Sequence, residues 1–167
     1  GVRYSKGGVA NVLTAFTDAD YAGCPDTRRS TSGYVCFLNN GPVSWMSKLQ
    51  QTVAVSTTEA EYMAASYCAS EVVFLRGLLE DLEFAQHGPT LMHEDNQGAV
   101  CLMKNSVMHS RAKHIDVRYH FVRDLIRGEV VNVQYCQTNE NVADILTKLL
   151  PRPIFEKHRA RLLGYSG

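Results

Sequence analysis

One apolar stripe constrains the fold of this 167-residue chain more than any other feature. It lies on a predicted helix that begins at Thr58, and its members recur at alternating steps of three and four, which is the spacing of a single helix face. The stripe consists of Ala65, Cys68, Val72, Leu75, Leu79 and Leu82. Because a helix of this kind has to bury one long face, it predicts packing against a sheet or against other helices.

The segments around this helix alternate between strand and helix patterns. Strands are predicted at 12–18, 33–38, 43–48, 90–94 and 130–136, with a turn at 39–42. Further helices are predicted from Asp95-Asn96 to Lys104, over 115–126, from a cap at Asn141 to Pro151, and over 154–163. Short links join the first three strands and helices join the later ones. This order predicts an α/β fold with a mixed five-stranded sheet, three strands antiparallel and the rest parallel, flanked by helices.

Composition and charge narrow the class of protein. The chain is 45% hydrophobic and 20% charged, as in ordinary globular domains, and its longest unbroken aliphatic or aromatic run, 72–75, is far too short to cross a membrane. Five scattered cysteines fit reduced thiols in the cytoplasm or nucleus. Residues 1–103 carry 6 Lys and Arg against 11 Asp and Glu, whereas 104–167 carry 11 against 6. This asymmetry indicates a polyanionic partner beside an acidic site, or two solvated faces.

Glu61 is the acid that fits its position least well. It continues the apolar stripe toward the start of the helix, and a carboxylate on a buried face is costly unless it is paired or binds a cation. Glu59 lies about 200° away around the helix and is expected to face solvent. The alternative for Glu61 is a capping box with Thr58, in which the carboxylate folds back onto the helix start.

Three further acids stand at strand ends or helix starts. Asp18 ends the first strand, Asp95 lies between a strand and a helix, and Asp144 follows the cap at Asn141. Taken singly, Asp18 could be a turn residue, Asp95 an N-cap and Asp144 an acid favoured by the helix dipole. Asp20 is expected to lie in the loop after the first strand. Strand ends on one edge of a sheet converge, however, and converging carboxylates call for divalent cations. Two such ions about 4 Å apart are a standard device for hydrolysing phosphodiesters.

The contexts of these acids resemble the ribonuclease H family, and specifically the ribonuclease H domain of copia-type retrotransposon polyproteins. Six motifs occur in the family's order, at 16–23, 26–34, 56–65, 94–97, 111–116 and 143–148. The resemblance implies a ribonuclease H-like domain at 12–151, preceded by a segment at 1–11 that is expected to continue from a longer chain. It is followed by a C-terminal helix and tail at 152–167.

The resemblance also implies an activity and a metal site. The expected reaction is hydrolysis of the RNA strand of RNA–DNA hybrids with two Mg²⁺ ions, for which Mn²⁺ could substitute. Asp18 would bridge both ions, Glu61 and Asp95 would hold one, and Asp144 would help to hold the other. The implied partner is a reverse transcriptase domain N-terminal to this segment, with no role for a membrane. The expected location is the cytoplasm, within a virus-like particle, or the nucleus.

Substrate contacts are expected at two places. By resemblance, the hydroxyls of Ser56, Thr57 and Thr58 would face the sugars and phosphates of the hybrid, although turn and capping chemistry explains them equally well. Lys113 and Arg118 belong to a basic stretch that could bind the phosphate backbone, or they could lie on a plain solvated helix. Three other functions stay open: a silent module that binds hybrid or duplex, a DNA-acting nuclease of the same superfamily, and an inert scaffold within a polyprotein.

Overall fold

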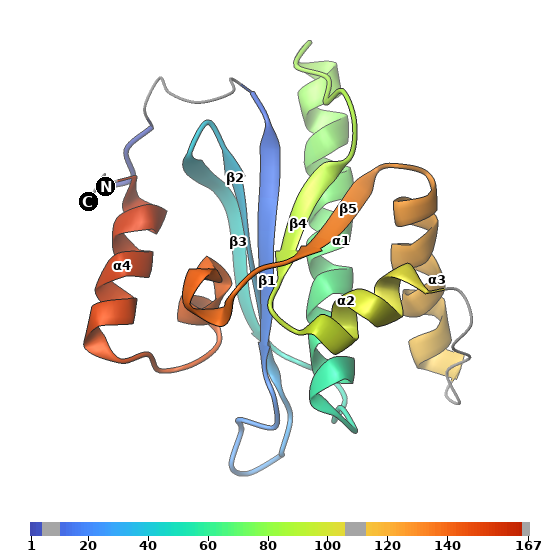
Figure 1. The fold of residues 1–167 in the computed structure, drawn as a ribbon, viewed down its shortest axis with the longest axis vertical. Coiled ribbons are helices and arrows are strands. Elements are labelled where there is room, and N and C mark those ends of the chain that lie inside the picture. The colour runs from blue at the N-terminus through green and yellow to red at the C-terminus, as the bar shows by residue number, and fades with distance from the viewer. Residues whose placement is uncertain (5–10, 106–112, 165–167) are drawn as a thin grey trace.

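A five-stranded mixed sheet organises the molecule, which is described by a computed structural model covering residues 1–4, 11–105 and 113–164, with the backbone alone at 113–119. The strand order is β3-β2-β1-β4-β5. Strands β1 (Leu13–Asp20), β2 (Thr31–Leu38) and β3 (Gly41–Leu49) are antiparallel, whereas β4 (Thr90–Glu94) and β5 (Val131–Tyr135) continue the sheet parallel to β1 (Figure 1). The predicted fold class is therefore confirmed.

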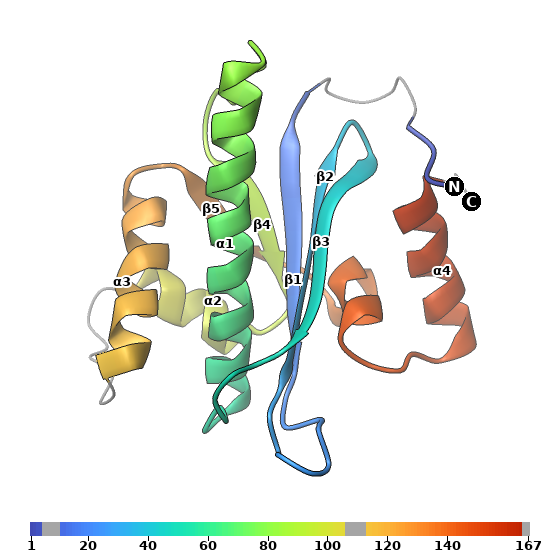
Figure 2. The same ribbon diagram turned by 180° about the vertical axis from the view of Figure 1, so that it is seen from behind.

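Helices cover the two faces of the sheet unequally. One face carries α1 (Thr57–Asp81), α2 (Gln97–Lys104) and α3 (Lys113–Arg127), which share a core with residues of the sheet, the edge strand β3 contributing only the partly buried Met46. The other face carries the short 3₁₀ helix η2 (Val142–Leu146) and α4 (Arg152–Leu163), packed over Phe16, Val35 and Phe37. Figure 2 shows the sheet standing between α1 and α4. Within the described residues, no helix is both long enough and apolar enough to cross a bilayer.

The apolar stripe of α1 forms the centre of the larger core. Cys68 and Val72 are fully buried and Leu75 and Leu79 nearly so, as the helical spacing predicted. Leu82 is an exception, since 55% of its surface is exposed. It is the C-cap residue of α1, one position beyond the last helical turn, so it no longer shares the buried face.

The hairpin between β2 and β3 is tighter than predicted. Its turn consists of Asn39 and Asn40 alone, both in the left-handed region with φ of 52° and 63°, while Gly41 and Pro42 already belong to β3. Asparagine tolerates this backbone conformation better than most residues, and two such residues make a two-residue hairpin. The first strand is also longer than predicted, because Asp20 ends β1 instead of lying in the loop.

The segment after β5 departs most from expectation. Asn141 caps it as predicted, with Oδ1 accepting a hydrogen bond of 3.2 Å from the Ala143 amide, but the helix is a 3₁₀ helix that ends at Leu146, not an α-helix that reaches Pro151. The Asn141 side chain also donates to the Thr17 carbonyl at 2.9 Å, which fixes the first turn against β1. Thr147 and Lys148 then turn their side chains toward Asp18, and the chain leaves the helical path.

The close approach of η2 to the sheet depends on Gly33 of β2. A Cβ atom at this position would lie 2.6 Å from Thr147 Cγ2 and 3.0 Å from Leu146 Cβ. We expect Gly33→Ala to lower the free energy of unfolding by about 1–3 kcal/mol, because the added methyl group overpacks this contact. Denaturant unfolding measures the effect. The matched control is Gly77→Ala in α1, where a Cβ would meet no atom within 4 Å, and this change should be neutral or stabilising. Equal effects of the two substitutions would contradict this account of the packing.

Candidate active site

The parallel strands β1 and β4 separate at their carboxyl ends and leave room for a site. They pair only through Thr14–Phe16 and Leu91–His93, so the last residues of β1 and β4 are not hydrogen-bonded to each other. From β1 the chain continues to β2 on one side, and from β4 it leads to β5 on the other side. Such a divergence at the carboxyl ends of parallel strands is where open α/β sheets place their ligands.

Three of the four predicted acids meet at this point. One side-chain oxygen each from Asp18, Glu61 and Asp95 lies within 4.8 Å of the others. They come from the end of β1, the first turns of α1 and the link between β4 and α2. Asp18 is fully buried and Glu61 is 7% exposed, whereas Asp95 is half-buried. Among the described residues, Glu61 Oε2 is a buried oxygen without a hydrogen-bond partner. The cluster therefore offers carboxylate oxygens that a divalent cation can bind.

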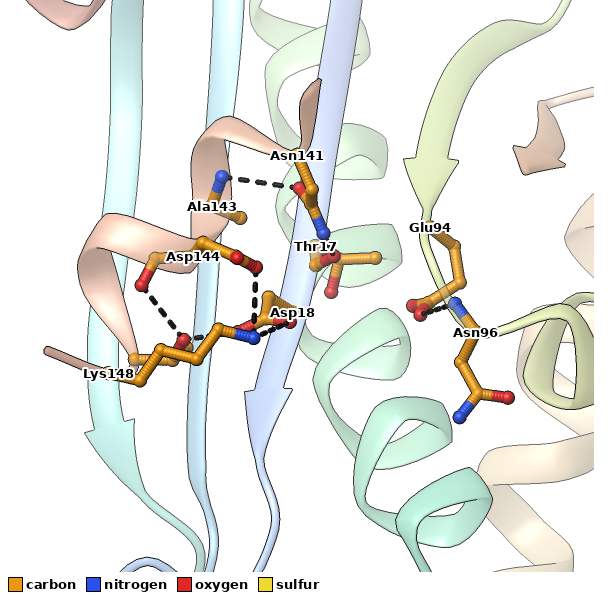
Figure 3. Close-up of polar contacts among 9 residues, drawn as sticks. Thr17, Asp18, Glu94, Asn96, Asn141, Ala143, Asp144 and Lys148 are labelled. Carbon is orange, nitrogen blue, oxygen red and sulfur yellow. Dashed lines mark hydrogen bonds and ion pairs between the residues drawn. The ribbon is translucent and has the colours of Figure 1, made fainter. Parts of the chain in front are cut away.

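Asp144 joins the same centre through a lysine that it shares with Asp18 (Figure 3). Lys148 Nζ lies 3.3 Å from Asp18 Oδ1 and 3.1 Å from Asp144 Oδ1, and the Thr147 hydroxyl donates to Asp18 Oδ2. Asp18 is thus shared between the cluster with Glu61 and Asp95 and the ion pairs with Lys148 and Asp144. Sequence reasoning assigned no role to Lys148, although its i,i+4 spacing from Asp144 is the signal of a helical ion pair.

Glu94 is a fifth acid that sequence reasoning missed. It is fully buried, its Oε1 accepts a hydrogen bond of 3.0 Å from the Asn96 amide, and within the described chain its Oε2 is unpartnered. The alternation along β4 would have found it, because Thr90, Met92 and Glu94 share one buried face. Burial, together with the neighbouring Asp95 and Asp18, raises the pKa of Glu94 well above its usual range.

Glu59 was expected to face solvent, and this expectation is wrong. Only 7% of its surface is exposed, because the chain before α1 folds over it. Its Oε2 accepts a hydrogen bond of 2.6 Å from the Val55 amide, and Ser56 Oγ accepts one of 3.1 Å from the Glu59 amide. The capping interaction therefore involves Ser56 and Glu59, not Thr58 and Glu61. Glu61 is left free to face the other acids.

The hydroxyl side chains predicted to contact substrate lie at the start of α1. Ser56 and Thr57 are exposed and Thr58 is half-buried at the start of α1, beside the acidic cluster. The N-cap of α2 is Asn96, whose Oδ1 accepts from the Ala99 amide at 2.9 Å, so Asp95 does not have the capping role that was its alternative. The side chains of Lys113 and Arg118 lie outside the described residues.

Burial and mutual repulsion shift the titration of the cluster. Burial, reinforced by Glu94 and Asp18, raises the pKa of Glu61 to about 11, and burial together with Asp18 raises that of Asp144 to about 7. Burial also raises the pKa of Asp95. Lys148 responds in the opposite sense, since its contacts with Asp18 and Asp144 raise its pKa despite a desolvation that lowers it. Glu61, Asp95 and Asp144, together with Glu94, thus resist ionisation, and this set of carboxyl groups is compatible with divalent metal binding.

We expect the metal-free protein to lose stability as the pH rises from about 4 to 7 and beyond. Between the ordinary pKa values and the raised ones, the folded chain retains protons that the unfolded chain releases, so the free energy of unfolding falls with increasing pH. A bound cation removes this penalty. The gain in Tm on adding Mg²⁺ should therefore be larger at about pH 8 than at about pH 5, measured by differential scanning calorimetry. An equal gain in Tm at both pH values would contradict the binding of Mg²⁺ by these acids.

The fold of this chain is similar to that of solved ribonuclease H and reverse transcriptase structures. The compost-derived LC11-RNase H1 superimposes with a TM-score of 0.60 at 15% identity, covering 88% of this chain and 97% of that one. The foamy viral protease-reverse transcriptase in complex with RNA/DNA hybrid matches with a TM-score of 0.57 at 15% identity, over 88% of this chain and 21% of that one. At these identities the likeness establishes the fold alone. The chain therefore has a ribonuclease H-like fold.

Proteins similar in sequence define a narrower group than the structural likeness does. The retrovirus-related Pol polyprotein from transposon TNT 1-94 of Nicotiana tabacum is 47% identical over 150 residues, which are 90% of this chain. That from transposon RE1 of Arabidopsis thaliana is 38% identical over 162 residues, or 97% of this chain. The chain spans 11% of the length of each polyprotein. No protein-family model matches. The chain is therefore homologous to one segment of copia-type retrotransposon Pol polyproteins, as the resemblance implied.

Proposed function

We propose that this domain hydrolyses the RNA strand of RNA–DNA hybrids with the help of two divalent cations. The observation that carries the proposal is the convergence of Asp18, Glu61 and Asp95 within 4.8 Å, with Asp144 linked to Asp18 through Lys148. The hybrid complex of the foamy viral relative in fold supports the choice of substrate, and the Pol homologues support a retroelement setting.

The positions of the four acids indicate which cation each would hold. Asp18, Glu61 and Asp95 would hold one cation, and Asp18 with Asp144 would hold the second. When bound, such ions supply an activated water and charge stabilisation at the leaving oxygen. Asn141 and Gly33 keep η2 close to the sheet and so hold Asp144 beside Asp18. The half-buried Asp95 leaves the cluster open on one side, where a phosphate could approach.

Ser56, Thr57 and Thr58 are proposed to read the substrate. Their place at the exposed start of α1, next to Glu61, would bring hydroxyl groups within reach of the 2′-OH that distinguishes RNA from DNA. The Ser56 oxygen already accepts the Glu59 amide hydrogen bond, which leaves its O–H free to donate. We also propose that Lys113 and Arg118 contact the phosphate backbone, and that the domain acts beside a reverse transcriptase within a longer polyprotein.

One comparison of substrates tests the proposal. Labelled RNA–DNA hybrid, double-stranded RNA and double-stranded DNA are each incubated with the chain and Mg²⁺ or Mn²⁺. We expect the RNA strand of the hybrid alone to be cut, leaving a 3′-OH and a 5′-phosphate. Cleavage of double-stranded DNA would instead indicate a DNA-acting nuclease. Binding of hybrid without cleavage under either metal would indicate a silent binding module.

A further inference from the structure

Lys148 occupies a position that the proposed two-cation function assigns to a metal ion. Its ammonium group lies between Asp18 Oδ1 and Asp144 Oδ1, at 3.3 Å and 3.1 Å (Figure 3). The Asp18 side chain is fully buried and that of Asp144 is 4% exposed, while that of Lys148 is 32% exposed. The lysine therefore enters from the solvent side and ends between two otherwise buried acids.

The chain itself keeps this lysine at the site. Lys148 follows Asp144 by one helical turn, and its backbone amide donates to the Asp144 carbonyl at 3.2 Å. Its neighbour Thr147 donates its hydroxyl to the other Asp18 oxygen. One short segment thus supplies an acid, a hydroxyl and an ammonium group around Asp18. Because the lysine is tethered in this way, its local concentration at the two carboxylates is high whatever the metal concentration is.

An ammonium group and a divalent ion cannot share these two oxygens. A Mg²⁺ ion binds carboxylate oxygens at about 2.0–2.1 Å, so an ion held by Asp18 Oδ1 and Asp144 Oδ1 would come within a few ångströms of the Lys148 nitrogen. Like charges at that separation in a partly buried site repel strongly. Among the described residues, Lys148 forms ion pairs with Asp18 and Asp144 and none with Glu61 or Asp95, so the three-acid position is not blocked in this way.

We infer that Lys148 is a built-in counter-ion at the second cation position, and that a divalent ion filling this position has to displace it. The inference rests on the proposed two-cation function and adds an order to it. The three-acid position fills first, and the second position fills weakly because its ligands are already neutralised. Because the Lys148 side chain is 32% exposed, the displaced ammonium group can swing toward solvent.

The experiment compares Lys148→Met with wild type and with Lys157→Met, which removes a lysine of α4 that pairs with the exposed Glu140. Isothermal titration with Mn²⁺ measures both ion affinities, and Tm in EDTA measures metal-free stability. We expect Lys148→Met to bind the second ion at least about tenfold more tightly, because a competing unit charge has been removed. Its Tm in EDTA should fall, since Asp18 and Asp144 lose their counter-ion. The control should match wild type in both measurements.

A second measurement uses the wild-type chain, so the test does not depend on the folding of a variant. NMR of lysine side chains, with the Lys148 signal assigned through Lys148→Arg, should show that this signal moves with the second equivalent of metal and not with the first. An unchanged or weaker second-ion affinity in Lys148→Met, or a Lys148 signal that ignores the second ion, overturns the inference.

The hybrid cleavage assay keeps the two proposals apart. If wild type does not cut hybrid but Lys148 still competes with the second ion, the proposed function fails and the counter-ion role stands. If wild type cuts hybrid while Lys148→Met leaves the second-ion affinity unchanged, the counter-ion role fails alone.

Discussion

Replacing Asp18 with asparagine is expected to reduce hybrid cleavage by at least about 1,000-fold. Asp18 is the one acid that faces both halves of the site: it lies within 4.8 Å of Glu61 and Asp95, and it shares Lys148 with Asp144. An amide keeps the shape of the side chain but supplies no negative charge to either cation. Loss of several kcal/mol of stabilisation at the transition state, at a factor of ten for each 1.4 kcal/mol, gives this magnitude. Single-turnover cleavage of labelled hybrid measures it.

The control for this substitution is Asp20→Asn. Asp20 lies on the same strand and, by the alternation of β1, on the same side as Asp18, but it does not belong to the three-acid cluster. We expect its cleavage rate to stay within a few-fold of wild type. A large loss in Asp20→Asn together with an active Asp18→Asn would show that the metal ligand on β1 has been misassigned.

The second large effect is expected for Glu61→Gln, again a loss of orders of magnitude in cleavage. Its Oε2 is buried without a hydrogen-bond partner in the described chain, and one of its oxygens lies within 4.8 Å of Asp18 and Asp95, so its carboxylate is available to a cation. Without metal, the Tm at neutral pH should hold or rise, because burial already raises the pKa of Glu61 to about 11 and glutamine resembles the protonated acid. The Tm gain on adding Mg²⁺ should shrink. Cleavage assays and calorimetry with and without Mg²⁺ measure these outcomes.

Glu59→Gln is the matched control, two positions away on the same helix. Glu59 accepts the Val55 amide hydrogen bond, and glutamine keeps an oxygen that can accept it. Stability should therefore fall by less than about 1 kcal/mol, and cleavage should stay close to wild type. If Glu59→Gln abolished cleavage and Glu61→Gln spared it, the roles of the two glutamates would be reversed.

Much of the fold is readable from local pattern. The helical spacing of α1, the strand at Thr90–Glu94 and the cap at Asn141 each depend on residues close together in the chain, and each appears in the structure. The choice of Glu61 over Glu59 as the inward-facing acid also follows from the helical period. The expected exposure of Glu59 is wrong, because it depends on where the preceding residues fold, which helical spacing does not describe.

The sequence by itself determined the element order, the mixed sheet and the identity of the acids at strand ends and helix starts, because period, capping and turn chemistry act over a few residues. Only the tertiary structure decided how those acids are neutralised. Lys148 and Asp18 are 130 positions apart, and η2 meets β1 through Asn141 and β2 through Gly33. Glu94 likewise becomes a buried fifth acid only when β4 lies inside the sheet, between β1 and β5. Burial and charge pairing are set by distances in space, and those exist only once the sheet and its two helical layers have assembled.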